Sequence, residues 1–298
     1  MSADVAVVVV TYNSRGVVPD LVDGLVAACG TTSIELVVVD NGSTDGTAEL
    51  LEERGVRVVR SENNGYSSGI NQGVAAVPGP SAILVLNPDV RLEPASVDRL
   101  LTTLRETGAG VVVPRIVDPD GRLSRSLRRE PTLRRWLGLT FTGHPALSEL
   151  VTDPAAYRVR SVADWATGAV MLVDRSLHDQ LGGWDESFFL YSEETDFSLR
   201  ARDAGWSTVY TPAAGAMHVG GGSGESATTH TMKILNRVRL YRRRRGTALA
   251  SVYYALTVVT EARRALLGHR KSWSTLRSLV LPSARPSMLG ARDSLLPR

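Results

Sequence analysis

The stretch that decides the fold is Leu36-Val37-Val38-Val39-Asp40-Asn41-Gly42-Ser43, in which an apolar run leads directly into an acidic turn. The same arrangement occurs twice more, where Ile83–Leu86 leads into Asn87-Pro88-Asp89 and where Phe188–Tyr191 leads into the acidic block Ser192–Asp196. In open α/β sheets, ligands bind in the crevice outside the carboxyl ends of the strands. Carboxylates delivered there in series can hold a nucleotide, a divalent cation and a reacting hydroxyl. The sequence therefore predicts an enzyme.

Further short apolar runs predict the rest of the sheet. Val5–Val10 and Ala82–Leu86 are continuous runs of aliphatic residues, typical of strands that are buried on both faces. Strand and helix patterns alternate as far as about residue 113, which predicts an α/β fold with a parallel sheet and covering helices. The predicted strands are 5–10, 35–39, 56–60, 82–86, 110–113, 169–173 and 208–211. The predicted helices are 20–28, 47–54 with Thr44 or Asp45 as cap, 95–106, and one that Ser192 caps and that runs to Asp203.

The charge of the chain is distributed unevenly along its 298 residues. Residues 1–229 hold 19 basic and 29 acidic residues, whereas residues 230–298 hold 15 basic and 2 acidic residues, so that a net charge of −10 is followed by one of +13. A basic tail on an acidic body indicates an anionic partner. We therefore divide the chain into a body, residues 1–229, and a basic helical C-terminal region, residues 230–298.

The C-terminal region contains the apolar stretch Thr247–Thr260, which Arg242–Arg245 precedes and further basic residues follow. The stretch is shorter than the ~20 residues of a membrane-spanning helix. Two interpretations remain open: a helix that lies in the interface of an anionic membrane, or a helix that packs on the body with a solvated charged face. Nucleic acid is not expected as a partner, because no known binding motif accompanies the charge.

Two features indicate a cytoplasmic protein. The single cysteine, Cys29, lies in an apolar stretch, so we expect a buried structural thiol and a reducing compartment. The N-terminal run Val5–Val10 is too short for the apolar region of a signal peptide, and Asp4 precedes it where a positive charge is usual. If the C-terminal region binds lipid, the protein is expected as a peripheral protein at the cytoplasmic face of the plasma membrane.

The order of the motifs resembles that of family-2 glycosyltransferases, which are inverting enzymes of the GT-A fold. The resemblance covers roughly residues 4–225 and rests on Val9–Asn13, Val39–Thr47, Glu62–Tyr66, Asn71, Asn87–Asp89 and Phe188–Asp196. It implies a donor half at about 1–113 and an acceptor half at about 114–229, the latter beginning with loops and short helices. The overall layout, including the basic tail and Asp164–Ala169, looks most like bacterial rhamnosyltransferases of cell-wall and polysaccharide assembly. The expected donor is a nucleoside-diphosphate sugar, with dTDP-rhamnose as the best guess, and the expected acceptor is a glycan or a polyprenyl-diphosphate-linked saccharide.

The resemblance also implies roles for the residues near the donor. Asp40 stands where the family's aspartate accepts a hydrogen bond from the imide of the nucleobase, and Thr11 and Asn13 resemble the other base and ribose contacts. A purely structural Asx-turn at Asp40 is the alternative, and the two roles are compatible. The full set of expected donor-binding residues is Thr11, Asn13, Asp40, Asn41, Asn64, Gly65, Asn71, Asn87 and Asp89.

A metal site is expected at Asp89, where the family has its Asp-x-Asp-type motif. Asp89 would bind Mg²⁺ or Mn²⁺, which bridges the diphosphate oxygens and offsets their charge. Asn87 replaces the first carboxylate of that motif, so Asp89 is the only strong ligand there. His218 would complete the metal site or contact the diphosphate, and the glycines at 220–224 can present N–H groups to phosphate. The alternatives are a simple turn and a structural histidine.

The acidic block at the start of the last predicted body helix supplies the candidate base. In the family the second acid of this block deprotonates the acceptor hydroxyl, and by position that acid is Glu194, with Glu193 as the second choice. Partial burial beneath neighbouring aromatic residues would raise the pKa of such a base. The alternative is that these acids only stabilise the helix dipole. Trp165, Gly168 and Asp196 are expected to bind the acceptor.

Two other classes of protein fit less well. A nicotinamide-dependent oxidoreductase would share the sheet and an acidic strand end, but the chain has no helix-opening G-x-G-x-x-G after a strand. A non-catalytic protein that binds anionic surfaces would explain the basic tail but not the three acidic clusters. The sequence predicts no oligomeric state.

Overall fold

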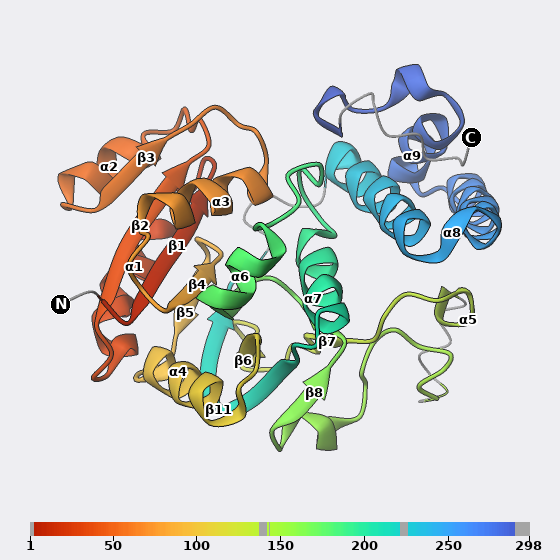
Figure 1. The fold of residues 1–298 in the computed structure, drawn as a ribbon. Helices are drawn as coiled ribbons and strands as arrows, with labels where there is room; N and C mark the ends of the chain where they lie inside the picture. Colours follow the sequence, from red (N-terminus) through yellow and green to blue (C-terminus); the bar gives the residue numbers. More distant parts are fainter. Residues whose placement is uncertain (1–2, 137–141, 143, 221–225, 290–298) are drawn as a thin grey trace.

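A computed structural model of the chain describes residues 3–136, 142, 144–220 and 226–289. Within these residues a central nine-stranded sheet is covered by helices on both faces, and a helical C-terminal region lies beside it (Figure 1). The strands run in the order β3-β2-β1-β4-β10-β6-β11-β5, and β8 pairs with β11. Their bounds are β1 Val5–Thr11, β2 Ile34–Asp40, β3 Arg57–Arg60, β4 Ala82–Leu86, β5 Val90–Leu92, β6 Val111–Val117, β8 Ser161–Ala163, β10 Val170–Asp174 and β11 Thr208–His218.

The remaining elements complete the description. Strands β7 (Leu127–Arg128) and β9 (Trp165–Ala166) form a separate antiparallel pair. The body helices are α1 Val18–Cys29, α2 Thr47–Glu53, α3 Tyr66–Ala76, α4 Ser96–Thr107, α5 Leu133–Trp136, α6 Arg175–Leu181 and α7 Glu193–Asp203, with a 3₁₀ turn η2 at Pro154–Tyr157. The C-terminal region consists of α8 Ala227–Leu266, α9 Arg270–Val280 and the 3₁₀ turns η3 Pro282–Ala284 and η4 Ser287–Leu289. The expected loops and short helices after residue 114 are therefore present.

The parallel part of the sheet agrees with the prediction. Strands β3, β2, β1 and β4 are parallel neighbours. Every residue of β1 is buried, and successive side chains enter two different cores: Val7 packs with residues of α1 and α4, and Val8 packs with residues of α3 and α7 on the opposite face. A strand that is covered on both faces has no polar side, which is why this part of the sequence reads as a continuous apolar run.

Beyond β4 the sheet departs from the all-parallel prediction. Strand β10 lies antiparallel between β4 and β6, although it comes from residues 170–174, far beyond both in the chain. Strand β6 pairs in parallel with β11 and has no pairing with β4. An apolar run specifies burial but neither direction nor neighbour, so the pattern could not show that a later strand is inserted into the sheet.

Helix α3 was not predicted, because its sequence contains Gly69 and Gly73, which weaken helix propensity. In the structure a Cβ atom at Gly73 would collide with the side chain of Val8 on β1. The glycines therefore let α3 lie close against the sheet. The predicted bounds of α7 are confirmed, since the helix ends at Asp203 with Ser192 at its N-cap position, but Ser192 has a φ of +74° and makes no side-chain cap bond. Before α2, the Asp45 carboxylate does accept the Thr47 N–H at 3.1 Å.

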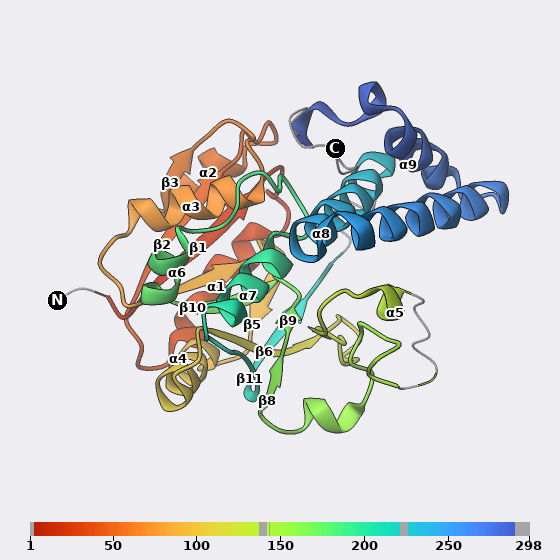
Figure 2. The same ribbon diagram turned by 45° about the vertical axis from the view of Figure 1, so that its right-hand side comes forward.

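The C-terminal region folds as a helical unit that packs on the body. Helix α8 is interrupted at Gly246, whose φ is +70°, and the chain folds back so that the two halves of α8 and α9 lie together (Figure 2). Tyr241 and Tyr253 stack across this break with ring centroids 4.1 Å apart. No helix in the described part of the chain combines the length and the apolar character needed to cross a membrane.

Ion pairs dock the first half of α8 onto the body, which supports the packed interpretation of the tail. Arg244 and Arg245 contact Glu130 at 3.0 and 2.9 Å, and Arg243 contacts Asp185 at 2.5 Å. Glu130 also binds Arg202 of α7 at 2.8 Å. The arginine run that the sequence associated with lipid is therefore neutralised largely by carboxylates of the body.

Candidate active site

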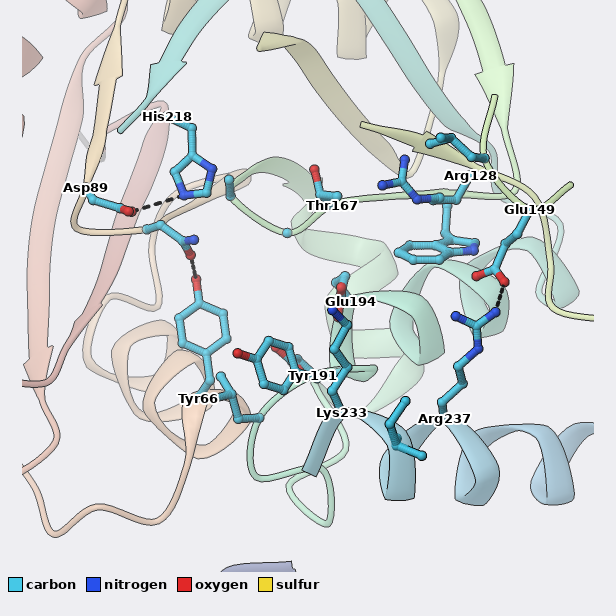
Figure 3. A pocket seen from close by; sticks show the side chains of 18 of the residues that line it. Tyr66, Asp89, Arg128, Glu149, Thr167, Tyr191, Glu194, His218, Lys233 and Arg237 are labelled. Atoms are coloured by element: carbon cyan, nitrogen blue, oxygen red, sulfur yellow. Dashed lines mark hydrogen bonds and ion pairs between the residues drawn. The ribbon is translucent and has the colours of Figure 1, made fainter. Parts of the chain in front are cut away.

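The carboxyl ends of β1 and β4 and the start of α7 border one cavity of about 1500 Å³, which residues of α8 also line (Figure 3). Sequence-predicted residues from distant parts of the chain meet there. Those that line the cavity are Asn13, Asn87, Asp89, Trp165, Gly168, Glu193, Glu194 and His218.

Asp89 and His218 form one corner of the cavity. Strand β11 pairs with β5 so that His218 faces Val90, and the Asp89 Oδ1 atom lies 3.2 Å from the His218 Nε2 atom. Burial acts to raise the pKa of Asp89, but the hydrogen bond and charge of His218 outweigh it, and the pKa lies below its usual value. Next to this pair, the Tyr66 hydroxyl donates to the Asn87 Oδ1 atom at 2.8 Å.

The residues of this corner fit a divalent cation that is shared with a ligand. Among the described residues there is no group of three or more His, Cys, Asp or Glu side chains that could hold a metal by themselves. One carboxylate and one imidazole within 3.2 Å of each other can nevertheless both reach one cation, if diphosphate oxygens and water supply its other ligands. The glycine-rich run expected to contact phosphate lies mostly at residues 221–224, outside the described residues.

Glu193 and Glu194 begin α7 and line the cavity, and Figure 3 shows Glu194 between the Asp89–His218 corner and Arg128. Glu193 is buried and Glu194 is half-buried. Burial raises the pKa of both carboxyls, and for Glu193 the charge of Glu194 adds to the effect. In each residue the Oε2 atom has no hydrogen-bond partner among the described residues. Greater access to the cavity favours Glu194 as the base, which remains a prediction.

The backbone before α7 is strained. Tyr191 and Ser192 have φ values of +68° and +74°, and neither residue is glycine. Such residues cost about 1–3 kcal/mol each and cluster at functional sites. The buried Asn236 of α8 donates through Nδ2 to the carbonyls of Leu190 and Tyr191 at 2.8 and 3.2 Å. The C-terminal region therefore helps to hold the loop that positions the candidate base.

Trp165 and Gly168 line the same cavity as Glu194, and their role in acceptor binding stays a prediction. The Trp165 indole N–H donates to the carbonyl of Arg129 at 3.1 Å, which fixes the ring in the cavity wall. A Cβ atom at Gly168 would lie 3.1 Å from the Glu194 Cβ atom, so a side chain there would crowd the glutamate. Asp196 does not line the cavity: it is buried and binds Arg200 at 2.6 Å. This position favours a structural role for Asp196 over acceptor binding.

Asp40 and Thr11 lie next to the cavity at adjacent strand ends, outside its lining residues. The buried Asp40 carboxylate accepts from the Thr11 hydroxyl at 2.8 Å and from the Ser43 N–H at 2.9 Å. The turn role considered for Asp40 is thus present. The Thr44 N–H donates to the Asn13 Oδ1 atom at 2.9 Å, so the loops after β1 and β2 are tied together at the entrance to the expected nucleotide site.

The other expected donor residues do not line the cavity but link the donor half to the acidic block. Asn41 donates to the Gly65 carbonyl at 3.0 Å, and a Cβ atom at Gly65 would lie 2.5 Å from the Phe189 carbonyl oxygen. Asn71 donates to the Trp184 carbonyl at 2.9 Å. Asn64 is exposed. These contacts position the segment that leads into α7, which is a structural reason for the residue types at these places.

Several cavity residues were not among the predicted site residues. Tyr66 borders the cation corner, Arg128 comes from β7, and Lys233 and Arg237 come from the first half of α8. Arg237 is paired with Glu149 and donates to the Tyr253 hydroxyl at 2.7 Å. No spacing rule connects Lys233 and Arg237 with the acidic motifs, because only the docking of α8 on the body brings them together.

The mixed sheet with a cleft at its strand ends is the GT-A fold of nucleotide-sugar transferases. GalNAc-T7 with UDP, GalNAc and Mn²⁺ superposes with a TM-score of 0.61 at 16% identity, over 81% of this chain and 48% of that one. Mannosyltransferase PcManGT from Pyrobaculum calidifontis, in complex with GDP-Man and Mn²⁺, superposes with a TM-score of 0.58 at 16% identity, over 98% of this chain and 86% of that one. At this level of identity the likeness concerns the fold.

The chain belongs to glycosyl transferase family 2, whose sequence profile matches residues 6–165, more than half of its length. N-acetylglucosaminyl-diphospho-decaprenol L-rhamnosyltransferase of Mycobacterium tuberculosis is 34% identical over 204 residues, 62% of this chain and 66% of that protein. The low-salt glycan biosynthesis hexosyltransferase of Haloferax volcanii is 30% identical over 207 residues, 68% of this chain and 62% of that protein. The matched region thus spans slightly less than two thirds of either relative.

Proposed function

We propose that the protein is a metal-dependent inverting glycosyltransferase that moves a sugar from a nucleoside-diphosphate sugar to a hydroxyl of a glycan or a lipid-linked saccharide. The observation that carries this proposal is that the Asp89–His218 pair and the Glu193–Glu194 pair line one cavity. L-rhamnose from dTDP-rhamnose and a polyprenyl-diphosphate-linked acceptor are the best-supported substrates, because the mycobacterial relative is named for rhamnosyl transfer to a diphospho-decaprenol.

The residues divide the chemistry between two sides of the cavity. Asp89 and His218 would hold Mg²⁺ or Mn²⁺, which offsets the charge that develops on the leaving diphosphate. Asp40, Thr11 and Asn13 would hold the nucleoside at the adjoining strand ends. Glu194 takes the proton of the acceptor hydroxyl. At the same time the hydroxyl oxygen of the acceptor bonds to the anomeric carbon of the donor sugar, and the bond from that carbon to the diphosphate breaks. A single displacement of this kind inverts the anomeric configuration. The raised pKa makes Glu194 a stronger base than a solvated glutamate.

Two measurements test the proposal. Calorimetric titration with TDP and with UDP should show binding that requires Mn²⁺ and that Asp89→Ala weakens strongly. The Asp120→Ala variant should bind as the wild type does, because Asp120 is an exposed aspartate outside the cavity lining. NMR of the transfer product should show the anomeric configuration opposite to that of the donor. Nucleotide binding that is indifferent to Mn²⁺ and to Asp89, or a retained configuration, would contradict the proposal.

We also propose peripheral association with the cytoplasmic face of the membrane, through a different surface from the arginine run. Val252, Val259 and Leu266 recur every seven residues on the second half of α8 and are 48%, 65% and 78% exposed. Trp273 and Val280 on α9 are also seven residues apart, and their side chains are exposed as well. These helices also carry exposed basic residues, which complement anionic headgroups. The basic residues are Arg263, Arg264, Arg270, Lys271 and Arg277.

Co-sedimentation with liposomes tests this surface. The wild type should pellet with anionic vesicles and less with neutral ones, and Val259→Ser combined with Leu266→Ser should reduce pelleting. Val26→Ser is the matched control, because Val26 is an equally exposed valine on α1 of the body. Equal pelleting of all three proteins would refute the assignment of this surface.

A further inference from the structure

The cavity continues beyond Glu194 into a basic end. Arg128 from β7 lines this end, and Lys233 from the first half of α8 lines the cavity as well. Figure 3 shows Arg128 on the opposite side of Glu194 from Asp89 and His218. Along the cavity the Asp89–His218 corner therefore comes first, Glu194 lies in the middle and Arg128 lies at the other end.

Arg128 is half-buried without a carboxylate partner among the described residues. Its Nη1 atom donates to the backbone carbonyls of Arg125 and Leu127, and its guanidinium stands 5.8 Å from the centre of the Trp165 ring. The Nε and Nη2 donors are not used by these bonds. Burial lowers the pKa of Arg128, but a guanidinium stays protonated, so the charge persists at a desolvation cost.

Other arginines that line the cavity differ from Arg128 in their pairing or in their exposure. Arg237 is neutralised by Glu149. Arg263 and Arg264 are exposed and make no side-chain hydrogen bond or ion pair with another described residue. Arg128 therefore combines partial burial with the lack of a carboxylate partner among the described residues, whereas Arg237 is paired and Arg263 and Arg264 are exposed.

We infer that Arg128, together with Lys233, forms a subsite for a diphosphate group carried by the acceptor. This inference rests on the proposed function, because it assumes that the acceptor hydroxyl is presented to Glu194. A guanidinium presents a fork of donors that matches phosphate oxygens, and Lys233 adds a second cationic side chain to the lining of the same cavity. The donor diphosphate belongs at the Asp89 side, so the two diphosphates occupy opposite ends and the transferred sugar lies between them.

The subsite replaces the arginine run 242–245 as the candidate for this role. None of these four arginines lines the cavity, and Arg243, Arg244 and Arg245 are paired with carboxylates of the body. An acceptor diphosphate at Arg128 is attached to a sugar that reaches Glu194 inside the cavity, whereas a diphosphate at Arg243 would lie outside it.

Titration with geranyl diphosphate tests the subsite without requiring the natural acceptor. The protein is first saturated with TDP or UDP and Mn²⁺, so that the donor end is filled. The wild type should then bind geranyl diphosphate, and Arg128→Met should weaken that binding at least about tenfold, as expected for the loss of a charged hydrogen bond. Arg128→Lys should retain part of the affinity. Arg125→Met is the matched control, since Arg125 is an exposed arginine three residues away that does not line the cavity.

The outcomes separate the inference from the proposed function. Binding of geranyl diphosphate that is equal in the wild type and in Arg128→Met, or no binding at all, overturns the subsite even if the nucleotide binds. Titrations with inorganic pyrophosphate and with geraniol identify which part of the molecule is recognised. If the subsite recognises the diphosphate group, pyrophosphate binds and geraniol does not, and the reverse result overturns the inference. If neither nucleotide binds, the proposed function fails, and the same titration without nucleotide still tests Arg128. Thermal unfolding checks that each variant is folded.

Discussion

Replacing Glu194 with glutamine should separate catalysis from donor binding. The change keeps the size of the side chain and removes the proton acceptor. A positioned general base contributes about 10²–10⁴-fold to the rate, which is ~3–5 kcal/mol of barrier at 1.36 kcal/mol per factor of ten. Because Asp89 and His218 lie at a different side of the cavity, the dissociation constant of the donor should stay within about twofold of wild type.

The pH dependence gives this prediction a second, independent readout. Burial raises the pKa of Glu194 above the ~4.3 of a solvated glutamate, so wild-type turnover should increase with pH through that raised value. The folded protein also holds this proton more tightly than the unfolded chain does. The resulting stabilisation is full below the unfolded pKa and is lost as pH rises through the folded pKa. The glutamine of Glu194→Gln does not titrate, so this variant does not lose stability in that pH range. The difference between its melting temperature and that of the wild type should therefore shift in favour of the variant as pH rises.

The assay compares initial transfer rates and donor affinity in the wild type, Glu194→Gln and Glu193→Gln. Glu193 is the matched control, because it is the adjacent carboxylate, its pKa is also raised by burial, and its side chain is less exposed than that of Glu194. Near-wild-type turnover of Glu194→Gln would refute the assignment of the base. If Glu193→Gln is inactive at the same time, the base lies one residue earlier. A parallel loss of donor affinity and turnover would instead place Glu194 in donor binding.

Three further predictions concern the metal, the backbone and the docked helix. Excess chelator should abolish transfer and added Mn²⁺ should restore it, and full activity in chelator would contradict a metal role. Gly65→Ala should lower the melting temperature and turnover, because the new Cβ atom would lie 2.5 Å from a backbone oxygen. Gly55→Ala is the control: it has no atom within 4 Å of the new Cβ and should cost only ~1–2 kcal/mol of left-handed backbone strain. Equal effects of the two substitutions would contradict this prediction. Glu130→Gln should lower the free energy of unfolding in urea by about 1–3 kcal/mol, since Glu130 is buried among three arginines. Glu106 forms an exposed ion pair with Arg160, so Glu106→Gln should change this free energy by less than about 1 kcal/mol.

The parts of the fold that the sequence predicted are those where one local pattern determines the outcome. Strands β1, β2 and β4 are continuous apolar runs because both faces are covered, and acidic turns mark the ends of β2 and β4. Helix α3 was missed because its stability comes from glycine-mediated packing on β1, which helix propensity does not contain.

The candidate site was predicted in its residues better than in its geometry. Asp89 and His218 were expected together, but their contact depends on the pairing of β5 with β11, which no periodicity specifies. Asp196 belongs to the same acidic block as Glu194 and points elsewhere, because neighbouring positions of a helix face different directions. Arg128 and Asn236 carried no signal, since their place in the site depends on tertiary docking alone.

The insertion of β10 between β4 and β6 limits how the enzyme could be divided or recombined. A fragment that ended near residue 113 would leave β4 as an open edge of apolar backbone, and such edges invite pairing between chains and aggregation. The donor and acceptor halves are therefore not modules that a linker separates, because one sheet runs through both. A chimaera between two enzymes of this type would have to keep β10 with the strands on either side of it, so its junctions belong in the loops after β10.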